Sequence, residues 1–478
     1  MSNKYLTLVK DSLIFAIGTI GSKMILFVLV PLYTNCLTPS EYGVADLVFT
    51  LSQLLLPFIC LGIYNAIIRY GLSKNENPKD VLLCGLVIAL IGTLLAIIIT
   101  PLIGLYESIG QWKWYFCAHI ILHMYLSVFQ NHAKSIGRNK TYAIISIAYT
   151  FVLAILNILF LLYGKMGIRG YLLANVIATV FAVLIFMIAC DVFTLPKSAR
   201  FNGTLLKQML KYSMPLMIDG VLWWLIQSSN KLFVELFLGT DILGLYTVAI
   251  KIPALMYVVV TIFYQAWGIS TVKEVENAND SDFYKNVFSV YTFLTFFVCI
   301  TIVSVIKPFM TVYVGEEYFI SWKYVPLLVV GNLFLAISDF FGVFYNALKK
   351  PVKNMIVSLV AALTSVSISI LTIRYIDMWA AVFSAFFAYF VIMWIRMIDI
   401  RKIIHIKIDW VRFFLNLFIV ITHCFLITLD FHPILISVVV ILMFGIVNIK
   451  FLKDIYLKTI KARCKGNTKL GDKDEKHL

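Results

Sequence analysis

The sequence contains few charged residues. Only 14% of its 478 residues are Asp, Glu, Lys or Arg, whereas a soluble domain carries roughly a quarter. Hydrophobic residues make up 61% of the chain, and the mean hydropathy is +0.92. The charges stand in short clusters between long apolar segments, a pattern that excludes an ordinary soluble domain and is typical of a polytopic membrane protein. The net charge of +15 therefore needs a membrane explanation first, and we expect no nucleic-acid partner.

Motifs of several chemistries are missing as well. The eight cysteines include no CxxC spacing and mostly lie in apolar runs, so we interpret them as small buried hydrophobic residues. No Walker-type glycine-rich loop occurs, which excludes ATP as the direct energy source. His119 and His123 have the i, i+4 spacing of a metal pair, but no HExxH motif and no third ligand accompany them. We expect no metal and no cofactor, and we interpret the two histidines as a packed or cavity-lining stripe.

Long apolar runs fill most of the chain. A hydrocarbon core of about 30 Å needs roughly 20 apolar residues per helix. That length predicts fourteen membrane-spanning helices, at residues 12–34, 43–69, 81–104, 113–134, 142–163, 168–190, 211–238, 243–270, 286–306, 323–347, 354–373, 378–396, 411–429 and 433–451. The predicted fold class is therefore an all-α polytopic membrane protein.

The distribution of Lys and Arg predicts the orientation of these spans. If the N-terminus is cytoplasmic, the cytoplasmic segments and the adjoining span ends hold 31 of the 40 basic residues. The external segments hold six, and Lys23, Lys231 and Lys251 lie within spans. Positive charge collects on the cytoplasmic side of membrane proteins, so we expect both termini in the cytoplasm.

A short turn near the N-terminus returns later in the chain. The segment LTPSEYG (residues 37–43) aligns with LGTDILG (residues 238–244) at an offset of 201 residues. PLIGLY aligns with PFMTVY at an offset of 207, and a third match follows at 215. Offsets that grow along the chain are expected when loops have lengthened in a duplicated unit. The sequence therefore predicts two copies of a six-helix unit.

This duplication predicts the domain organisation. An even number of helices in each copy makes the copies parallel, related by an axis along the membrane normal. We expect an N-lobe at residues 1–191 (helices 1–6), a cytoplasmic linker at 192–210 and a C-lobe at 211–396 (helices 7–12). Two further helices at 397–452 and a basic cytoplasmic tail at 453–478 complete the predicted chain.

Three segments of the sequence resemble a known transporter superfamily. They are LTPSEYG after the first span, GIYNAIIRYG (residues 62–71) at the end of the second, and TPLIGLY (residues 100–106) at the end of the third. With the plan of six, six and two helices, the chain resembles the multidrug/oligosaccharidyl-lipid/polysaccharide exporter superfamily, and more narrowly its Wzx-type polysaccharide flippases. The resemblance implies movement of an undecaprenyl-pyrophosphate-linked oligosaccharide across the cytoplasmic membrane, for O-antigen or capsular polysaccharide biosynthesis.

Basic residues inside the spans are candidates for binding the anionic head group. A charge at mid-bilayer costs roughly 2.5–3.5 kcal/mol, so it normally faces a protein interior or a wet cavity. Lys23 and Lys251 have no acidic residue on their own helix face. We expect them to line a central cavity, the alternative being an ion pair with another helix. Lys231 is a third candidate, although Glu235 at i+4 favours a structural pair.

Two acidic residues and one arginine are further candidates. Asp219 and Asp339 lie in spans without a local base, so each is a candidate for binding a coupling proton or sodium ion. The alternatives are a cap at a helix kink or a buried ion pair. Arg69 ends the second span, where it would either grip the lipid pyrophosphate or extend to the membrane interface.

An aromatic and polar stretch in the seventh span is the candidate for sugar contacts. Trp223 and Trp224 offer aromatic faces, and Gln227 and Asn230 offer amides. These groups suit stacking on sugar rings and hydrogen bonds to hydroxyls, and packing at the interface is the alternative interpretation.

These features favour a flippase that works by alternating access, driven by a proton or sodium gradient. We expect a multi-pass protein of the bacterial cytoplasmic (inner) membrane. Its expected partners are the lipid-linked oligosaccharide, the bilayer, a polysaccharide polymerase and a chain-length regulator. No extended external loop carries a catalytic set, so we do not expect an enzyme. The alternatives are a flippase for another lipid-linked cell-wall precursor and a multidrug exporter of the same superfamily, which a basic cavity disfavours because it repels cationic drugs.

Overall fold

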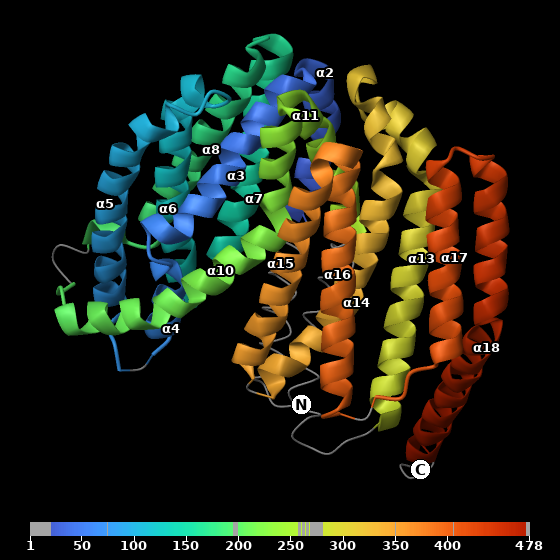
Figure 1. Cartoon of the computed structure of the whole chain (residues 1–478). Helices are drawn as coiled ribbons and strands as arrows, with labels where there is room; N and C mark the ends of the chain where they lie inside the picture. The colour runs from blue at the N-terminus through green and yellow to red at the C-terminus, as the bar shows by residue number, and fades with distance from the viewer. Residues whose placement is uncertain are drawn as a thin grey trace.

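The structure of the chain is a computed structural model. It describes residues 21–474, apart from residues 74, 195–198, 257–259, 261–262, 264–266, 268–280, 349 and 405. The side chains of residues 219, 281, 346–347, 351 and 454–474 lie outside this description. The described residues form helices and turns without a strand, which confirms the predicted all-α class (Figure 1).

The first half of the chain forms a bundle, the N-lobe. Its α-helices are α2 (Val30–Cys36), α3 (Pro39–Ile59), α4 (Ile63–Gly71), α5 (Pro78–Ile103), α6 (Lys113–Ser135), α7 (Asn139–Asn157) and α8 (Gly167–Ala189). Two short helices, η1 (Gly110–Trp112) and η2 (Ile158–Tyr163), precede α6 and continue α7. Helix α6 packs against α5 and α8, and α7 packs against α8, so α6 and α8 form the centre of the bundle.

The second half forms the C-lobe and a flanking hairpin. The C-lobe contains α10 (Gly203–Leu238), α11 (Thr240–Ala249), α13 (Ser281–Tyr313), η4 (Glu316–Lys323), α14 (Val325–Ala347), α15 (Pro351–Ile376) and α16 (Met378–Arg401). The hairpin consists of α17 (Trp410–Thr428) and α18 (Pro433–Asp474). It packs on α13 and α14, on the side of the C-lobe away from the N-lobe (Figure 1).

Ten of the described helices are long and apolar enough to cross a membrane. Every one of the fourteen predicted spans contains a described helix. The first and eighth spans reach into residues outside the description, and α6 and α10 are more polar than the ten. The structure therefore confirms a polytopic helical membrane protein.

The predicted continuous helix at 43–69 is wrong, because the chain breaks between α3 and α4. Leu61 and Gly62 both adopt positive φ, at 50° and 61°, which ends the regular helix. Helix α10, from the other half of the chain, packs against the break, where the Ser213 hydroxyl donates to the Leu61 carbonyl at 2.8 Å. A Cβ at Gly62 would lie 3.2 Å from the Ser213 carbonyl oxygen. The conformation of the break and this close approach both favour glycine.

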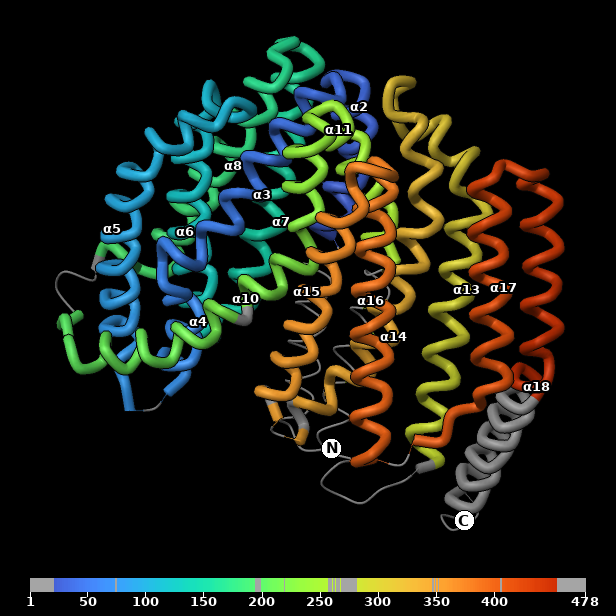
Figure 2. The backbone as a smooth tube through the Cα atoms, viewed as in Figure 1, coloured from blue at the N-terminus to red at the C-terminus, as the bar shows by residue number. Residues whose placement is uncertain are grey.

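Helix α10 joins the two lobes. Its first part packs on α4 and α5 of the N-lobe, and its later part packs on α15 and α16 of the C-lobe. Figure 2 shows this long path as a green tube that runs under the N-lobe and then rises between the lobes. The predicted linker at 192–210 is thus partly the beginning of α10, because Gly203 already starts the helix after an Asn202 cap.

Helices α3 and α11 cross where the two lobes meet. Thr38 and Glu41 form a capping box that starts α3 directly after the turn, with Pro39 in the first helical position. A Cβ at Gly43 would lie 2.2 Å from the Thr240 carbonyl oxygen, and a Cβ at Gly244 would lie 2.0 Å from the Pro39 carbonyl oxygen. Only glycine permits so close a crossing of two backbones.

The crossing also displays the duplication predicted from the sequence. Gly43 and Pro39 become Gly244 and Thr240 when shifted by 201 residues, and the two glycine contacts are reciprocal. Asp46 and Thr247 are related by the same shift and are hydrogen-bonded to each other across the crossing at 3.1 Å. Equivalent residues therefore face each other across an approximate two-fold axis that passes between the lobes.

Candidate functional site

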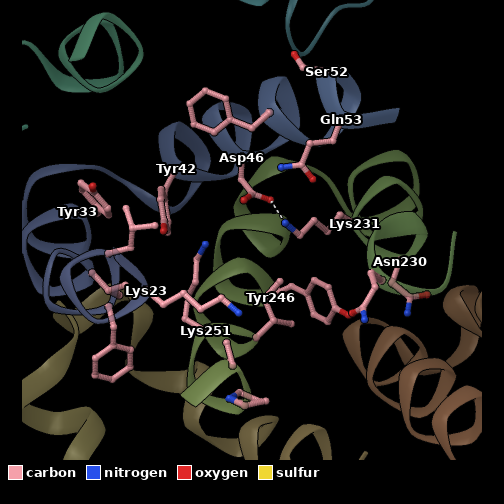
Figure 3. Close-up of a pocket in the computed structure, with 18 of the residues that line it drawn as sticks. Lys23, Tyr33, Tyr42, Asp46, Ser52, Gln53, Asn230, Lys231, Tyr246 and Lys251 are labelled. Carbon is pink, nitrogen blue, oxygen red and sulfur yellow. Dashed lines mark ion pairs between the residues drawn. The ribbon is translucent and has the colours of Figure 1, made fainter. Parts of the chain in front are cut away.

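A cavity of about 640 Å³ lies between the lobes. Its walls come from α2, α3, α6, α7 and α8 on one side and from α10, α11, α14 and α16 on the other. Figure 3 shows part of this lining, and its labelled side chains include Asp46 of α3, Lys231 of α10 and Tyr246 of α11. Because both lobes contribute walls, any motion between the lobes changes the cavity.

An ion pair between the lobes occupies one part of the cavity. The Lys231 ammonium on α10 lies 2.8 Å from the Asp46 carboxylate on α3, and both side chains are about nine-tenths buried. The Thr50 hydroxyl donates to the same carboxylate at 3.4 Å, in addition to Thr247. Asp46 also attracts Lys251. A single carboxylate therefore binds one lysine and two hydroxyls and interacts electrostatically with a second lysine.

This arrangement corrects one prediction and supplies a residue that the sequence analysis missed. The expected pair of Lys231 with Glu235 is wrong: Lys231 faces α3, and Glu235 instead accepts hydrogen bonds from Tyr106 and Ser108 of the N-lobe. Asp46 was not among the candidates, although it is an acidic residue inside a predicted span and the same burial argument applies to it.

The other two lysines line the same cavity. Lys251 lies just beyond the end of α11, and Lys23 extends from the helical segment that precedes α2. A shift of 201 residues relates Lys23 to Trp224 and Thr50 to Lys251. The Trp224 indole donates to the Thr50 carbonyl at 3.2 Å, so the two-fold relation brings Lys23 and Lys251 into the equivalent neighbourhood (Figure 3).

The charge balance of the cavity is positive. Its charged lining residues, within the described part of the chain, are Lys23, Lys231, Lys251 and Asp46. Three positive charges against one negative charge, inside walls of low polarity, produce a local field that attracts anions. The cavity can thus bind an anionic group and repel a cationic one.

The predicted sugar-contact residues separate into two groups. Gln227 and Asn230 line the cavity, but the Asn230 amide is already engaged by hydroxyls of Ser369 and Ser384 at 2.6 and 2.9 Å. Neither Trp223 nor Trp224 is among the lining residues: Trp224 is buried with its indole bonded to α3. The structure therefore brings the amides, but not the indoles, to the cavity.

The remaining candidates lie elsewhere. Arg69 is exposed in the last turn of α4 and does not line the cavity. The side chain of Asp219 lies outside the described residues. Asp339 is paired with Arg396 at 3.3 Å, inside the C-lobe, and both side chains are buried. Of the three roles considered for Asp339, the structure shows the buried ion pair.

The lobes close over one end of the cavity, which we call the closed end. The hydroxyls of Ser40 and Thr240 are 2.7 Å apart across the α3–α11 crossing. Tyr318 of η4 donates to the Leu37 carbonyl at 3.0 Å. Burial, together with the carboxylate of Glu317, raises the pKa of Tyr318, so its phenol stays protonated and remains a donor. In Figure 1 the two lobes converge at this end and diverge towards the other.

The described residues contain no group of three or more His, Cys, Asp and Glu side chains that could hold a metal ion. The cavity therefore offers binding by lysines, hydroxyls, amides and aromatic rings. These groups suit the recognition of a polar anionic molecule.

Comparison with known proteins gives a family for the chain. A family model described as "Polysaccharide biosynthesis protein" matches residues 34–323. This region runs from α2 through η4 and includes the α3–α11 crossing. No curated protein matches the chain.

Solved structures share the fold at low sequence identity. An inward-facing multidrug resistance MATE family transporter of the MOP superfamily is 13% identical, with a TM-score of 0.64 over 81% of this chain and 93% of that one. An outward-facing MATE family transporter is 14% identical, with a TM-score of 0.61 over 83% and 94%. A MOP superfamily transporter from Pyrococcus furiosus, with a binding pocket described as of reverse polarity, is 14% identical, with a TM-score of 0.58 over 83% and 94%.

Family and fold agree with the resemblance found in the sequence motifs. The solved structures have the transporter fold of the MOP superfamily, with both lobes covered. The family model matches more than half of the chain. The chain therefore belongs to the polysaccharide biosynthesis protein family, and its fold is that of the MOP superfamily transporters.

Proposed function

We propose that the protein is a flippase that moves an undecaprenyl-pyrophosphate-linked oligosaccharide across the bacterial cytoplasmic (inner) membrane. The family supports a role in polysaccharide biosynthesis, and the fold supports a membrane transporter. The product would serve O-antigen or capsule synthesis, with a polymerase and a chain-length regulator acting on the exported units. The function needs no catalytic group, in keeping with a transporter rather than an enzyme.

The observation that carries the proposal is the gathering of Lys23, Lys231 and Lys251 in one cavity between the lobes. A pyrophosphate diester carries two negative charges, and the three lysines with Asp46 leave an excess of two positive charges. Binding this head group would neutralise a cavity that otherwise holds unbalanced charge in a medium where charge is costly. The lipid tail would remain in the bilayer while the head group occupies the cavity.

The multidrug exporter alternative is disfavoured by the same lysines. The similar MATE structures are described as multidrug resistance transporters, but identity of 13–14% carries over the fold alone. A positive cavity repels cationic drugs and attracts phosphates. A flippase for another lipid-linked cell-wall precursor uses the same head-group chemistry, so it is the nearer alternative.

The transport cycle follows from the closed end. We assign the closed end to the external side and both termini to the cytoplasm, in line with the distribution of Lys and Arg. The head group would enter from the cytoplasmic side, and rocking of the lobes would open the α3–α11 crossing for its release. A proton or sodium gradient would drive net export.

Reconstitution in liposomes tests this function. Labelled undecaprenyl pyrophosphate bearing a short oligosaccharide is followed as it becomes accessible on the opposite leaflet. We expect fast transfer by the wild type, and at least tenfold slower transfer by the Lys23→Gln/Lys251→Gln double variant, because each lost contact between charged groups weakens binding by roughly 1.5–3 kcal/mol.

Lys140→Gln is the matched control, since Lys140 is exposed at the start of α7 and lies outside the cavity. The control is expected to transfer the lipid at the wild-type rate. If the double variant transferred the lipid as fast as the wild type, the two lysines would have no part in the mechanism. Transfer of a cationic drug, without transfer of the lipid, would replace the flippase by the exporter alternative.

A further inference from the structure

The N-lobe wall of the cavity contains two stacked histidines that the lysine site does not use. His119 and His123 lie one turn apart on α6, and both line the cavity. Their ring centroids are 4.1 Å apart, and the Phe49 ring of α3 stands 4.6 Å from His119. Three rings thus form one continuous surface across α3 and α6.

Both imidazoles have a buried nitrogen without a partner. His119 is only 7% exposed, and neither its Nδ1 nor the Nε2 of His123 has a hydrogen-bond partner among the described residues. Buried polar atoms in native proteins are nearly always partnered, because leaving one unpaired is costly. Because both histidines line the cavity, a molecule bound there can supply the missing partner.

The surroundings favour a neutral polyhydroxylated ligand over an ion. The Tyr171 ring lies 5.7 Å from Phe49 and extends the aromatic surface, and Tyr149 and Asn175 line the same wall. None of the four charged lining residues belongs to α6, α7 or α8. Aromatic faces beside neutral donors and acceptors suit a sugar ring, whose apolar face stacks while its hydroxyls form hydrogen bonds.

The position of this wall matches the architecture of the head group. Asp46 and Phe49 are three residues apart on α3, which is a rise of about 4.5 Å along the helix. The aromatic wall therefore begins about one turn from the carboxylate that holds Lys231. In a lipid-linked saccharide the first sugar is bonded directly to the pyrophosphate, so it falls beside this wall when the pyrophosphate meets the lysines.

We propose that His119, His123 and Phe49 form the subsite for the first sugar of the head group. The inference rests on the proposed function, since it assumes that the lysines hold the pyrophosphate. The imidazole nitrogens would bond sugar hydroxyls, and the Phe49 face would stack on the ring. The subsite would make transport depend on the presence of a sugar, which the lysines alone do not require.

Two probes separate the subsite from the lysine site. Transfer in liposomes is measured for undecaprenyl pyrophosphate alone and for the same lipid bearing one N-acetylhexosamine. The variants His119→Phe and His123→Phe keep a ring in place and remove the nitrogens. We expect the wild type to prefer the sugar-bearing lipid, and each variant to reduce that preference roughly five- to tenfold while transfer of the bare lipid stays unchanged.

His132→Phe is the matched control, because His132 is a buried histidine of the same helix that does not line the cavity. It is expected to keep the preference. Equal loss for both probes in the two variants, or no loss at all, would overturn the subsite. A wild type that transfers both lipids equally well would also overturn the subsite. So would variants that change only the pH dependence of transfer between pH 6 and 8, because that result would indicate that the two histidines bind protons. Failure of the wild type to move either probe would instead contradict the proposed function.

Discussion

The Asp46 carboxylate is the ion-pair partner of one cavity lysine and interacts electrostatically with a second. Lys231 forms the ion pair at 2.8 Å, and Lys251 is attracted by the same group. A buried pair adds little net stability, but breaking it leaves an uncompensated charge. A pyrophosphate that reaches the cavity offers the lysines an alternative partner. On the proposed function, Asp46 and the pyrophosphate would compete for the same lysine.

A double-mutant cycle tests this role of Asp46. Lys231→Met alone and Asp46→Asn alone are each expected to lower the apparent melting temperature in detergent, because each leaves a charge less well balanced. The combined variant should be more stable than the sum of the two effects, by roughly 1–3 kcal/mol. Thermal unfolding followed by intrinsic fluorescence provides the measurement. Additive effects of the two changes would show that the residues do not interact.

Sequence reasoning identified the lysines of the cavity but not their carboxylate. Lys23 and Lys251 stood out because no acid lies on their own helix face, and both line the cavity. Lys231 was paired with Glu235 by i, i+4 spacing, whereas its partner Asp46 lies 185 positions away in the chain. Spacing along one helix cannot reveal a contact between helices, which depends on how the lobes pack.

At the scale of elements, the α3–α11 crossing depends on two glycines. A Cβ added at either glycine would lie against a backbone oxygen of the opposite segment, at 2.2 Å for Gly43 and 2.0 Å for Gly244. Backbone atoms cannot move aside as the end of a flexible side chain does, so any larger residue must separate the helices. The repeated turn in the sequence therefore encodes a contact surface between the lobes as well as a loop between helices.

Gly244→Ala is expected to loosen the closed end and to raise the reactivity of Cys36. Cys36 ends α2 at the closed end and is partly exposed, whereas the other described cysteines are buried. Maleimide labelling, with mass spectrometry to locate the label, measures the rate at Cys36. Gly445→Ala in α18 is the control, since nothing lies within 4 Å of a Cβ at that position. An unchanged labelling rate in Gly244→Ala would mean that α3 and α11 accommodate the methyl group without opening the closed end.

The element pattern was largely predictable, and its interruptions were not. Apolar length and turn residues predicted fourteen spans; each contains a described helix, and ten of the described helices are long and apolar enough to cross a membrane. The break at Leu61 and Gly62 was missed, since the Ser213 contact made there comes from a helix distant in the sequence. The prediction of two lobes came from the duplicated motif, and residues related by the offset of 201 make reciprocal contacts at the α3–α11 crossing.

At the scale of the whole molecule, the lobes are held together mainly by α10 and α11. The pairs α3–α11, α3–α10, α4–α10 and α5–α10 form the principal contacts between them, while α14, α15 and α16 pack within the C-lobe. Because the first part of α10 packs on the N-lobe and its later part packs on the C-lobe, a rotation of the C-lobe relative to the N-lobe would bend α10. The hinge would then lie within α10, which contains Pro215 and therefore lacks one backbone hydrogen bond.

A cross-link at the closed end tests whether the lobes must separate there. The hydroxyls of Ser40 and Thr240 are 2.7 Å apart, so cysteines at these two positions bring their sulfur atoms within bonding reach. In a Cys36→Ser background, oxidation of the Ser40→Cys/Thr240→Cys protein is expected to abolish lipid transfer in liposomes, and a reductant is expected to restore it. Each single cysteine variant, treated identically, should keep its activity. If the oxidised double variant transferred lipid at the full rate, the head group would leave by a path that never parts α3 from α11, and alternating access through the closed end would be wrong.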